Sequence, residues 1–128
     1  MFKRKLYDDL LLWKKEGGRT ALLIEGARRV GKSTLVENFA QKEYRSYLLI
    51  DFSIASEEMK ALFQTYRSDL NQLFFFLTSL TGVELHQRES LIIFDEVQLF
   101  PPARQLIKHL VKDGRYDYIE TGSLLSIK

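Results

Sequence analysis

No cysteine occurs among the 128 residues of this chain. That absence excludes disulfide bonds and thiolate metal sites, and it favours the reducing cytoplasm over a secreted location. Long apolar runs are also lacking, because stretches such as FFFL and LIIF fall far short of the roughly 18 to 20 apolar residues that span a bilayer. We therefore expect a soluble cytoplasmic protein with no membrane partner.

A strong excess of charge of one sign is missing as well. The 19 basic and 17 acidic residues leave a net charge of +2, which is too small to predict a nucleic-acid-binding surface. Short basic clusters at 3–5, 14–15 and 28–29 are best explained as solvated surface, with nucleic acid as the alternative. His86 and His109 have no partners at metal-ligand spacing. The length and the 45% of apolar residues indicate one globular domain over the whole chain.

The first residues, MFKRKLYDDLLLW, place a basic cluster before leucines, as a signal peptide does. Asp8 and Asp9 interrupt that pattern, and no small-residue cleavage site follows. We interpret residues 1–16 as an N-terminal helix.

Four short apolar runs, at 20–25, 47–52, 91–96 and 116–121, predict strands. The first three lack polar alternation, which is typical of central parallel strands covered by helices on both faces. The fourth alternates more, and we expect it nearer a rim of the sheet.

Helical patterns separate these strands. Apolar residues recur at helical spacing after residue 32 and again over 103–113, where the pattern starts behind two prolines and stops before Gly114. The segment 53–82 predicts two helices, with serines 53, 56 and 68 as candidate N-caps. The alternation of strands and helices predicts a three-layer α/β/α domain with a mainly parallel sheet.

The segment GARRVGKST matches the phosphate-binding pattern G-x-x-x-x-G-K-[ST], and it lies between a predicted strand and a predicted helix. Such a loop wraps a triphosphate with backbone N–H groups, so it needs glycine where a side chain would block the approach or where φ is positive. The alternative is a tight turn without a ligand. The predicted phosphate-binding residues are Gly26, Ala27, Arg28, Arg29, Val30, Gly31, Lys32, Ser33 and Thr34.

Within this loop, Lys32 is expected to reach the β- and γ-phosphates, and the Ser33 hydroxyl to coordinate Mg²⁺. Thr34 is a spare hydroxyl. The motif does not require Arg28 or Arg29, and we expect these side chains to face solvent rather than a phosphate.

The segment LIIFDEVQ supplies a second part of the predicted site. Its four apolar residues predict a buried strand, after which Asp95 and Glu96 emerge at the carboxyl end, where open α/β sheets bind ligands. Asp95 would hold Mg²⁺ through water, and Glu96 would accept a proton from the attacking water. The alternative is a strand that simply ends at the surface. Gln98 either senses the γ-phosphate or is an exposed glutamine.

The fourth predicted strand ends in ETGS, which places Thr121 and Ser123 at the same edge of the sheet. Either hydroxyl could bond both the γ-phosphate and the attacking water, and the alternative is a plain strand-to-loop turn.

Together, GARRVGKST, LIIFDEVQ and IETGS, in this order, resemble the N-terminal ATPase domain of a prokaryotic AAA+ family, whose members are similar to archaeal ATPases and carry a longer C-terminal region. The opening helix fits the same resemblance. It implies ATP binding by the loop 26–34, Mg²⁺ at Asp95, Glu96 as the base, and Thr121 or Ser123 at the sensor position.

The resemblance also implies a sheet whose phosphate-loop strand lies between the fourth strand and a fifth. Because the sequence ends at Lys128, we expect about four strands, without the fifth strand, the arginine finger or the helical lid. An arginine finger is worth on the order of 10³ to 10⁵ in rate. Slow turnover without partner subunits is therefore expected.

Three functions compete at this point. The first is Mg²⁺-dependent ATP hydrolysis coupled to a protein partner or a C-terminal domain. The second is a nucleotide-binding switch or scaffold fragment with little turnover, and the third is a small-molecule kinase, which Glu96 disfavours. The N-K-x-D motif that recognises guanine does not follow the fourth predicted strand, which disfavours GTP as the nucleotide. Self-association into a homo-oligomer stays open.

Overall fold

The computed structural model of the chain describes residues 2–26 and 31–123. Its four strands form one parallel sheet in the order β1-β4-β3-β2. The elements in chain order are α1 (Phe2–Lys15), β1 (Leu22–Gly26), α2 (Lys32–Glu43), β2 (Ser46–Asp51), α3 (Glu57–Thr65), α4 (Leu70–Thr81), β3 (Ser90–Asp95), the 3₁₀ turn η1 (Val97–Leu99), α5 (Pro101–Asp113) and β4 (Asp117–Ser123). All four predicted strands are thus confirmed, with ends shifted by one or two residues.

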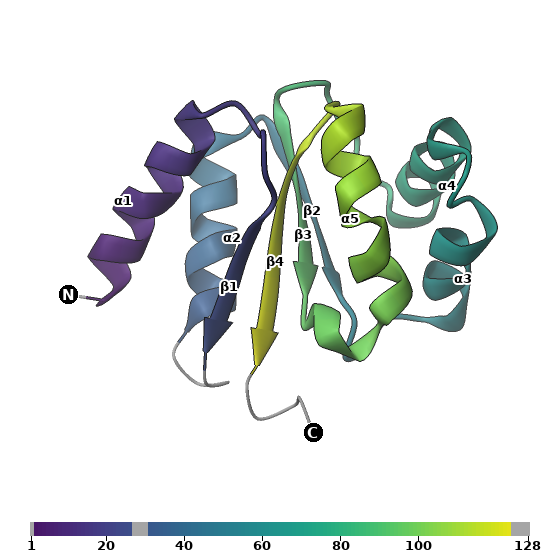
Figure 1. Cartoon of the computed structure of the whole chain (residues 1–128), viewed down its shortest axis with the longest axis horizontal. Helices are drawn as coiled ribbons and strands as arrows, with labels where there is room; N and C mark the ends of the chain where they lie inside the picture. The colour runs from purple at the N-terminus through teal and green to yellow at the C-terminus, as the bar shows by residue number, and fades with distance from the viewer. Residues whose placement is uncertain (1, 27–30, 124–128) are drawn as a thin grey trace.

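The order of the strands decides which helices cover which face. The chain crosses the sheet from β1 to β2 in one direction, and the connections from β2 to β3 and from β3 to β4 step back in the other. Because crossovers between parallel strands are right-handed, the helix of the first crossover and those of the later two must lie on opposite faces. Figure 1 shows α1 and α2 on one face and α3, α4 and α5 on the other. The predicted three-layer α/β/α fold is confirmed.

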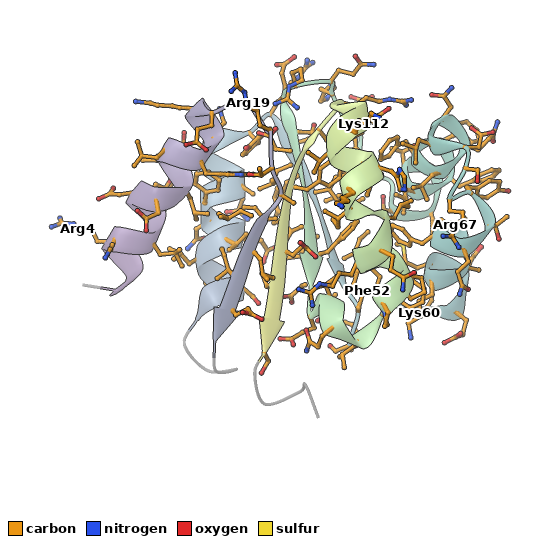
Figure 2. The ribbon with its side chains drawn as sticks, viewed as in Figure 1. Arg4, Arg19, Phe52, Lys60, Arg67 and Lys112 are labelled. Atoms are coloured by element: carbon orange, nitrogen blue, oxygen red, sulfur yellow. The ribbon has the colours of Figure 1, made fainter. Side chains whose placement is uncertain are left out.

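The central strand β3 supplies apolar side chains to both layers. Ile92 and Phe94 point into the cluster under α3, α4 and α5, and Leu91 and Ile93 point into the cluster under α1 and α2. In the first cluster, Phe52 stacks on Phe100 and packs edge-to-face against Phe94, and Figure 2 shows it on the side of the sheet where α5 lies. Of the helices in residues 2–26 and 31–123, none is long and apolar enough to cross a membrane.

Of the three serines predicted as candidate N-caps, only Ser56 has that role, and the Ser53 hydroxyl instead donates to Asp51. Ser56 caps α3, where its hydroxyl accepts a hydrogen bond from the Met59 N–H at 3.1 Å. The N-cap of α4 is Asp69 and not Ser68, because the Asp69 carboxylate accepts from the Gln72 N–H at 3.2 Å. A carboxylate at that end also favours the positive pole of the helix dipole.

The position of β4 differs from our expectation of a strand near a rim. It lies between β1 and β3, and all seven of its residues are buried. Its polar side chains are tolerated there because several have partners inside the protein: Asp117 bonds to Tyr44 and Arg88, and Thr121 bonds to Asp95. Conversely, β1 has a neighbouring strand on one side only, among the residues that the structure describes.

Asp117 links several segments of the chain at the edge of the sheet where the strands begin. One carboxylate oxygen accepts from the Tyr44 hydroxyl at 2.6 Å, and the other accepts from Arg88 Nη2 at 2.6 Å. The Arg88 guanidinium also donates to the backbone oxygens of Gly17 and Gly114, each at 3.0 Å. Burial, reinforced by Asp117, raises the pKa of the Tyr44 hydroxyl, so it stays a donor. Four separate segments are therefore held together at this amino edge.

Glu120 is a less satisfied buried acid on β4. Glu120 is 8% exposed, its Oε1 atom has no hydrogen-bond partner in the part of the chain that the structure describes, and Arg104 Nε lies 3.8 Å from it. Burial raises the pKa of the Glu120 carboxyl, and Arg104 partly opposes that rise. A raised pKa means that the ionised form is less stable in the folded state than in the unfolded state.

Replacing Glu120 with Gln should therefore stabilise the protein at pH 7, by on the order of 1 kcal/mol, because a neutral amide is less costly to bury than a carboxylate. The protonated wild type carries no such penalty, so the difference should shrink as the pH falls towards 4. Urea unfolding at both pH values measures it. Glu89→Gln, at an exposed ion pair 3.7 Å long, is the control and should change little. Destabilisation by Glu120→Gln at pH 7 would contradict this account.

Candidate functional site

The strand and the helix that the phosphate-binding pattern requires are both in place. β1 ends at Gly26, and α2 begins at Lys32 behind Gly31, whose φ of 74° lies in the left-handed region that favours glycine. Gly31 supplies no side-chain cap, so the N-cap residue leaves the first N–H groups of α2 available at the positive end of the helix dipole. The predicted contacts of Ala27, Arg28, Arg29 and Val30, and of the Lys32 side chain, lie outside what the structure describes and stay predictions.

Asp95 brings the two predicted halves of the site together. It is the last residue of β3, 7% exposed, and its Oδ1 atom accepts hydrogen bonds from the Ser33 hydroxyl at 2.9 Å and from the Thr121 hydroxyl. The period of two along each strand turns Asp95 and Thr121 to the face that α2 covers. One buried carboxylate thus joins α2, β3 and β4.

Glu96 follows in an unusual backbone conformation. Its φ of 55° and ψ of 48° are left-handed, which costs a residue other than glycine about 1 to 3 kcal/mol. Such strain often occurs at functional sites, although Arg88, at the opposite edge of the sheet, is left-handed too. The Glu96 N–H donates to the Thr121 hydroxyl at 3.2 Å, and the residue is 7% exposed. The alternative that Asp95 and Glu96 merely end a strand at the surface is therefore wrong.

Gln98 lies against Glu96 and does not face open solvent. Its Nε2 atom donates to Glu96 Oε1 at 2.8 Å, and its own Oε1 atom is buried. The interpretation of Gln98 as a plain exposed glutamine is wrong, and the structure leaves contact with a phosphate untested.

The two candidate hydroxyls of β4 differ in what they already bind. The Thr121 hydroxyl donates to Asp95 and accepts from the Glu96 N–H. The Ser123 hydroxyl is buried and has no hydrogen-bond partner among the described residues. Ser123 is the register partner of Gly26, the first residue of the phosphate-binding pattern. Ser123 is thus the hydroxyl of this pair that can bond a ligand without giving up a partner.

Sequence reasoning missed Asp51, the last residue of β2 and the register partner of Asp95. Its Oδ1 atom accepts from the Ser53 N–H at 2.9 Å and from the Ser53 hydroxyl at 2.6 Å. The signal was present, since Asp51 stands near the end of the second predicted strand as Asp95 does in the third. It adds a carboxylate to the same edge of the sheet.

The oxygen donors at this edge suit Mg²⁺. Ser33 offers a hydroxyl and Asp95 a carboxylate, and Mg²⁺ takes oxygen ligands while it keeps several waters. Among the described residues, no group of three or more His, Cys, Asp or Glu side chains could hold a metal by itself. This arrangement fits an ion held largely by phosphates and water.

Thr121→Val should lower the free energy of unfolding by about 1 to 3 kcal/mol, because Asp95 loses a donor and the Glu96 N–H loses its acceptor. Ser123→Ala is the matched control in the same strand. It removes a buried hydroxyl that has no partner in the described part of the chain, so stability should change by less than about 0.5 kcal/mol or rise slightly. Urea unfolding of the nucleotide-free proteins compares them. Equal losses would show that the Thr121 bonds contribute nothing.

The chain is similar to known proteins both in its sequence and in its fold. The family model of the AAA domain matches residues 18–128, from the turn after α1 onwards. A solved structure of PCH-2 from C. elegans is similar over 99% of this chain, with a TM-score of 0.57 and 14% sequence identity. This chain spans 37% of that protein's chain, and at such identity the likeness concerns the fold alone. No curated protein matches this chain.

The family match covers most of the chain, including β1, the start of α2, β3 and β4, which carry the site. The fold of the solved structure agrees with it. The chain therefore belongs to the AAA domain family and forms a nucleotide-binding, ATPase-type P-loop domain.

Proposed function

We propose that this chain binds ATP with Mg²⁺ at the carboxyl edge of its sheet and hydrolyses the bond to the γ-phosphate. The observation that carries the proposal is the hydrogen bond of 2.9 Å between Ser33 and Asp95. It joins the helix that follows the phosphate-binding pattern to the carboxylate at the end of β3, 62 residues later. A bare strand-to-helix turn would have no need of that carboxylate.

In this proposal the loop 26–34 holds the triphosphate. Backbone N–H groups from Gly31 onwards and the dipole of α2 attract the phosphate oxygens, and Lys32 adds a positive charge at the β- and γ-phosphates. Ser33 and Asp95 would hold Mg²⁺, Ser33 directly and Asp95 through water. When bound, the ion neutralises charge that develops on the phosphates.

Glu96 is the proposed general base. Its carboxylate takes a proton from water while the water oxygen bonds to the γ-phosphorus and the bond to the bridging oxygen of ADP breaks, so the products are ADP and inorganic phosphate. Thr121 holds the carboxylate of Asp95 and the backbone of Glu96 in place. The Ser123 hydroxyl, which has no hydrogen-bond partner among the described residues, would bond the γ-phosphate or the attacking water.

We further propose that hydrolysis is coupled to a protein partner or to a domain outside these residues, with a second copy of the chain as one candidate. The outer edge of β1 supports this, because no strand in residues 2–26 or 31–123 pairs with it. An unpaired strand edge is a template for another strand.

Lys32→Ala should abolish ATP binding, and Glu96→Gln should keep it but lower turnover by roughly 10² to 10⁴, which is the usual contribution of a general base. Calorimetry measures ATP affinity, and phosphate release with the chain in excess over labelled ATP measures turnover. Lys112→Ala is the control for lost positive charge, since Lys112 lies at the opposite edge of the sheet (Figure 2).

Equal turnover by wild type and Glu96→Gln would rule out Glu96 as the base. Tight ATP binding without any phosphate release would favour the nucleotide-binding switch. Phosphate transfer that appears only with an added small acceptor would favour a kinase.

A further inference from the structure

We propose that Gln98 is a positioning residue that holds the Glu96 carboxylate where it can accept the proton. The inference rests on the proposed role of Glu96 as the base, and it deepens that role. Gln98 is not required by the phosphate-binding pattern or by the carboxylate pair, and its two amide atoms lie in two different surroundings.

The amide nitrogen of Gln98 contacts the Glu96 carboxylate. Gln98 Nε2 donates to Glu96 Oε1 at 2.8 Å, a length normal for a bond to a charged acceptor. Such a bond restricts rotation about the last torsion of the glutamate, which is otherwise broad. The bond from Gln98 therefore limits the orientations that the Glu96 carboxylate can take.

The backbone makes this short-range contact possible. Side chains two residues apart do not face each other on a regular helix. Here the left-handed φ of 55° at Glu96 turns the chain at once into the 3₁₀ turn η1, which the bond from the Leu99 N–H to the Glu96 oxygen closes at 3.1 Å. The strained conformation of Glu96 and the contact with Gln98 thus belong to one arrangement.

The amide oxygen of Gln98 lies against the backbone of β4. Gln98 Oε1 is buried and has no hydrogen-bond partner among residues 2–26 and 31–123, and it lies 3.0 Å from the position that a Cβ atom on Gly122 would occupy. Gly122 stands between Thr121 and Ser123, the two hydroxyls of the site. The amide is therefore confined at both ends, by Glu96 on one side and by β4 on the other.

A buried acceptor without a partner costs free energy. An arrangement kept only for stability would gain by replacing the amide with an apolar side chain. The amide offsets this cost only through its bond to Glu96. That favours a role in holding the carboxylate over a role in packing.

Gln98→Ala should lower the single-turnover rate by about 10- to 100-fold, the range expected when a reacting group shifts by up to roughly 1 Å. The affinity for ATP should stay within about twofold. In the Glu96→Gln background, Gln98→Ala should cause no further loss, because its effect passes through Glu96. Gln105→Ala, an exposed glutamine on α5, is the matched control and should change neither quantity.

Gly122→Ala gives a second variant that leaves Gln98 and Glu96 in the sequence. The new methyl group would lie 3.0 Å from Gln98 Oε1, so the amide must shift by a few tenths of an ångström. We expect a loss in rate smaller than that of Gln98→Ala, and again no loss in the Glu96→Gln background.

A readout that needs no turnover is the NMR signal of the Gln98 side-chain amide in the nucleotide-free protein. One of its protons should be shifted downfield by the carboxylate, and Glu96→Ala should move it to the position of the exposed Gln105 amide. A Gln98 signal identical to that of Gln105 in the wild type would overturn the inference. So would an undiminished rate in Gln98→Ala while Glu96→Gln is impaired. An unimpaired Glu96→Gln would instead overturn the proposed function.

Discussion

The Asp95 carboxylate is buried at the end of β3 and accepts hydrogen bonds from two hydroxyl groups, Ser33 on α2 and Thr121 on β4. A buried charge without such donors would be very costly, so these three elements cannot move apart without a large loss of free energy. The same bonds set the start of α2 over the carboxyl edge of the sheet. The start of α2, the turn at Glu96 and Thr121 on β4 are all positioned around this carboxylate.

The two edges of the sheet are built differently. At the amino edge, Asp117 has both carboxylate oxygens bonded, and Arg88 links it to two backbone oxygens. At the carboxyl edge, the Ser123 hydroxyl and Gln98 Oε1 are buried and have no hydrogen-bond partner among the described residues. A left-handed residue other than glycine occurs at each edge, Glu96 at the carboxyl edge and Arg88 at the amino edge. Strain and unsatisfied polar groups concentrate at functional sites and must be compensated elsewhere. At the amino edge, the left-handed Arg88 is held by its bonds to Asp117, Gly17 and Gly114.

Sequence patterns predicted the elements well because each strand is a short apolar run and each helix has its own start or stop signal. They were less reliable about positions across the sheet. The polar alternation of β4 predicted a rim strand, yet β4 is interior, since a buried polar side chain with an internal partner has the same sequence pattern as an exposed one. The sequence also predicted Ser68 as the cap of α4, whereas Asp69 is the cap. Both residue types can cap a helix, so only the backbone geometry decides which of two neighbours does.

By itself, the sequence determined the class of the fold, the phosphate-binding pattern and the carboxylates at the end of β3, because these depend on residue types at fixed spacing along the chain. Only the tertiary structure decided which side chains meet. Ser33 and Asp95 are 62 residues apart, and Thr121 is a further 26 along. The strand order and the right-handed crossovers bring them to one edge and one face. The contact between Gln98 and Glu96 depends in the same way on a left-handed backbone angle at Glu96, which residue identity alone does not specify.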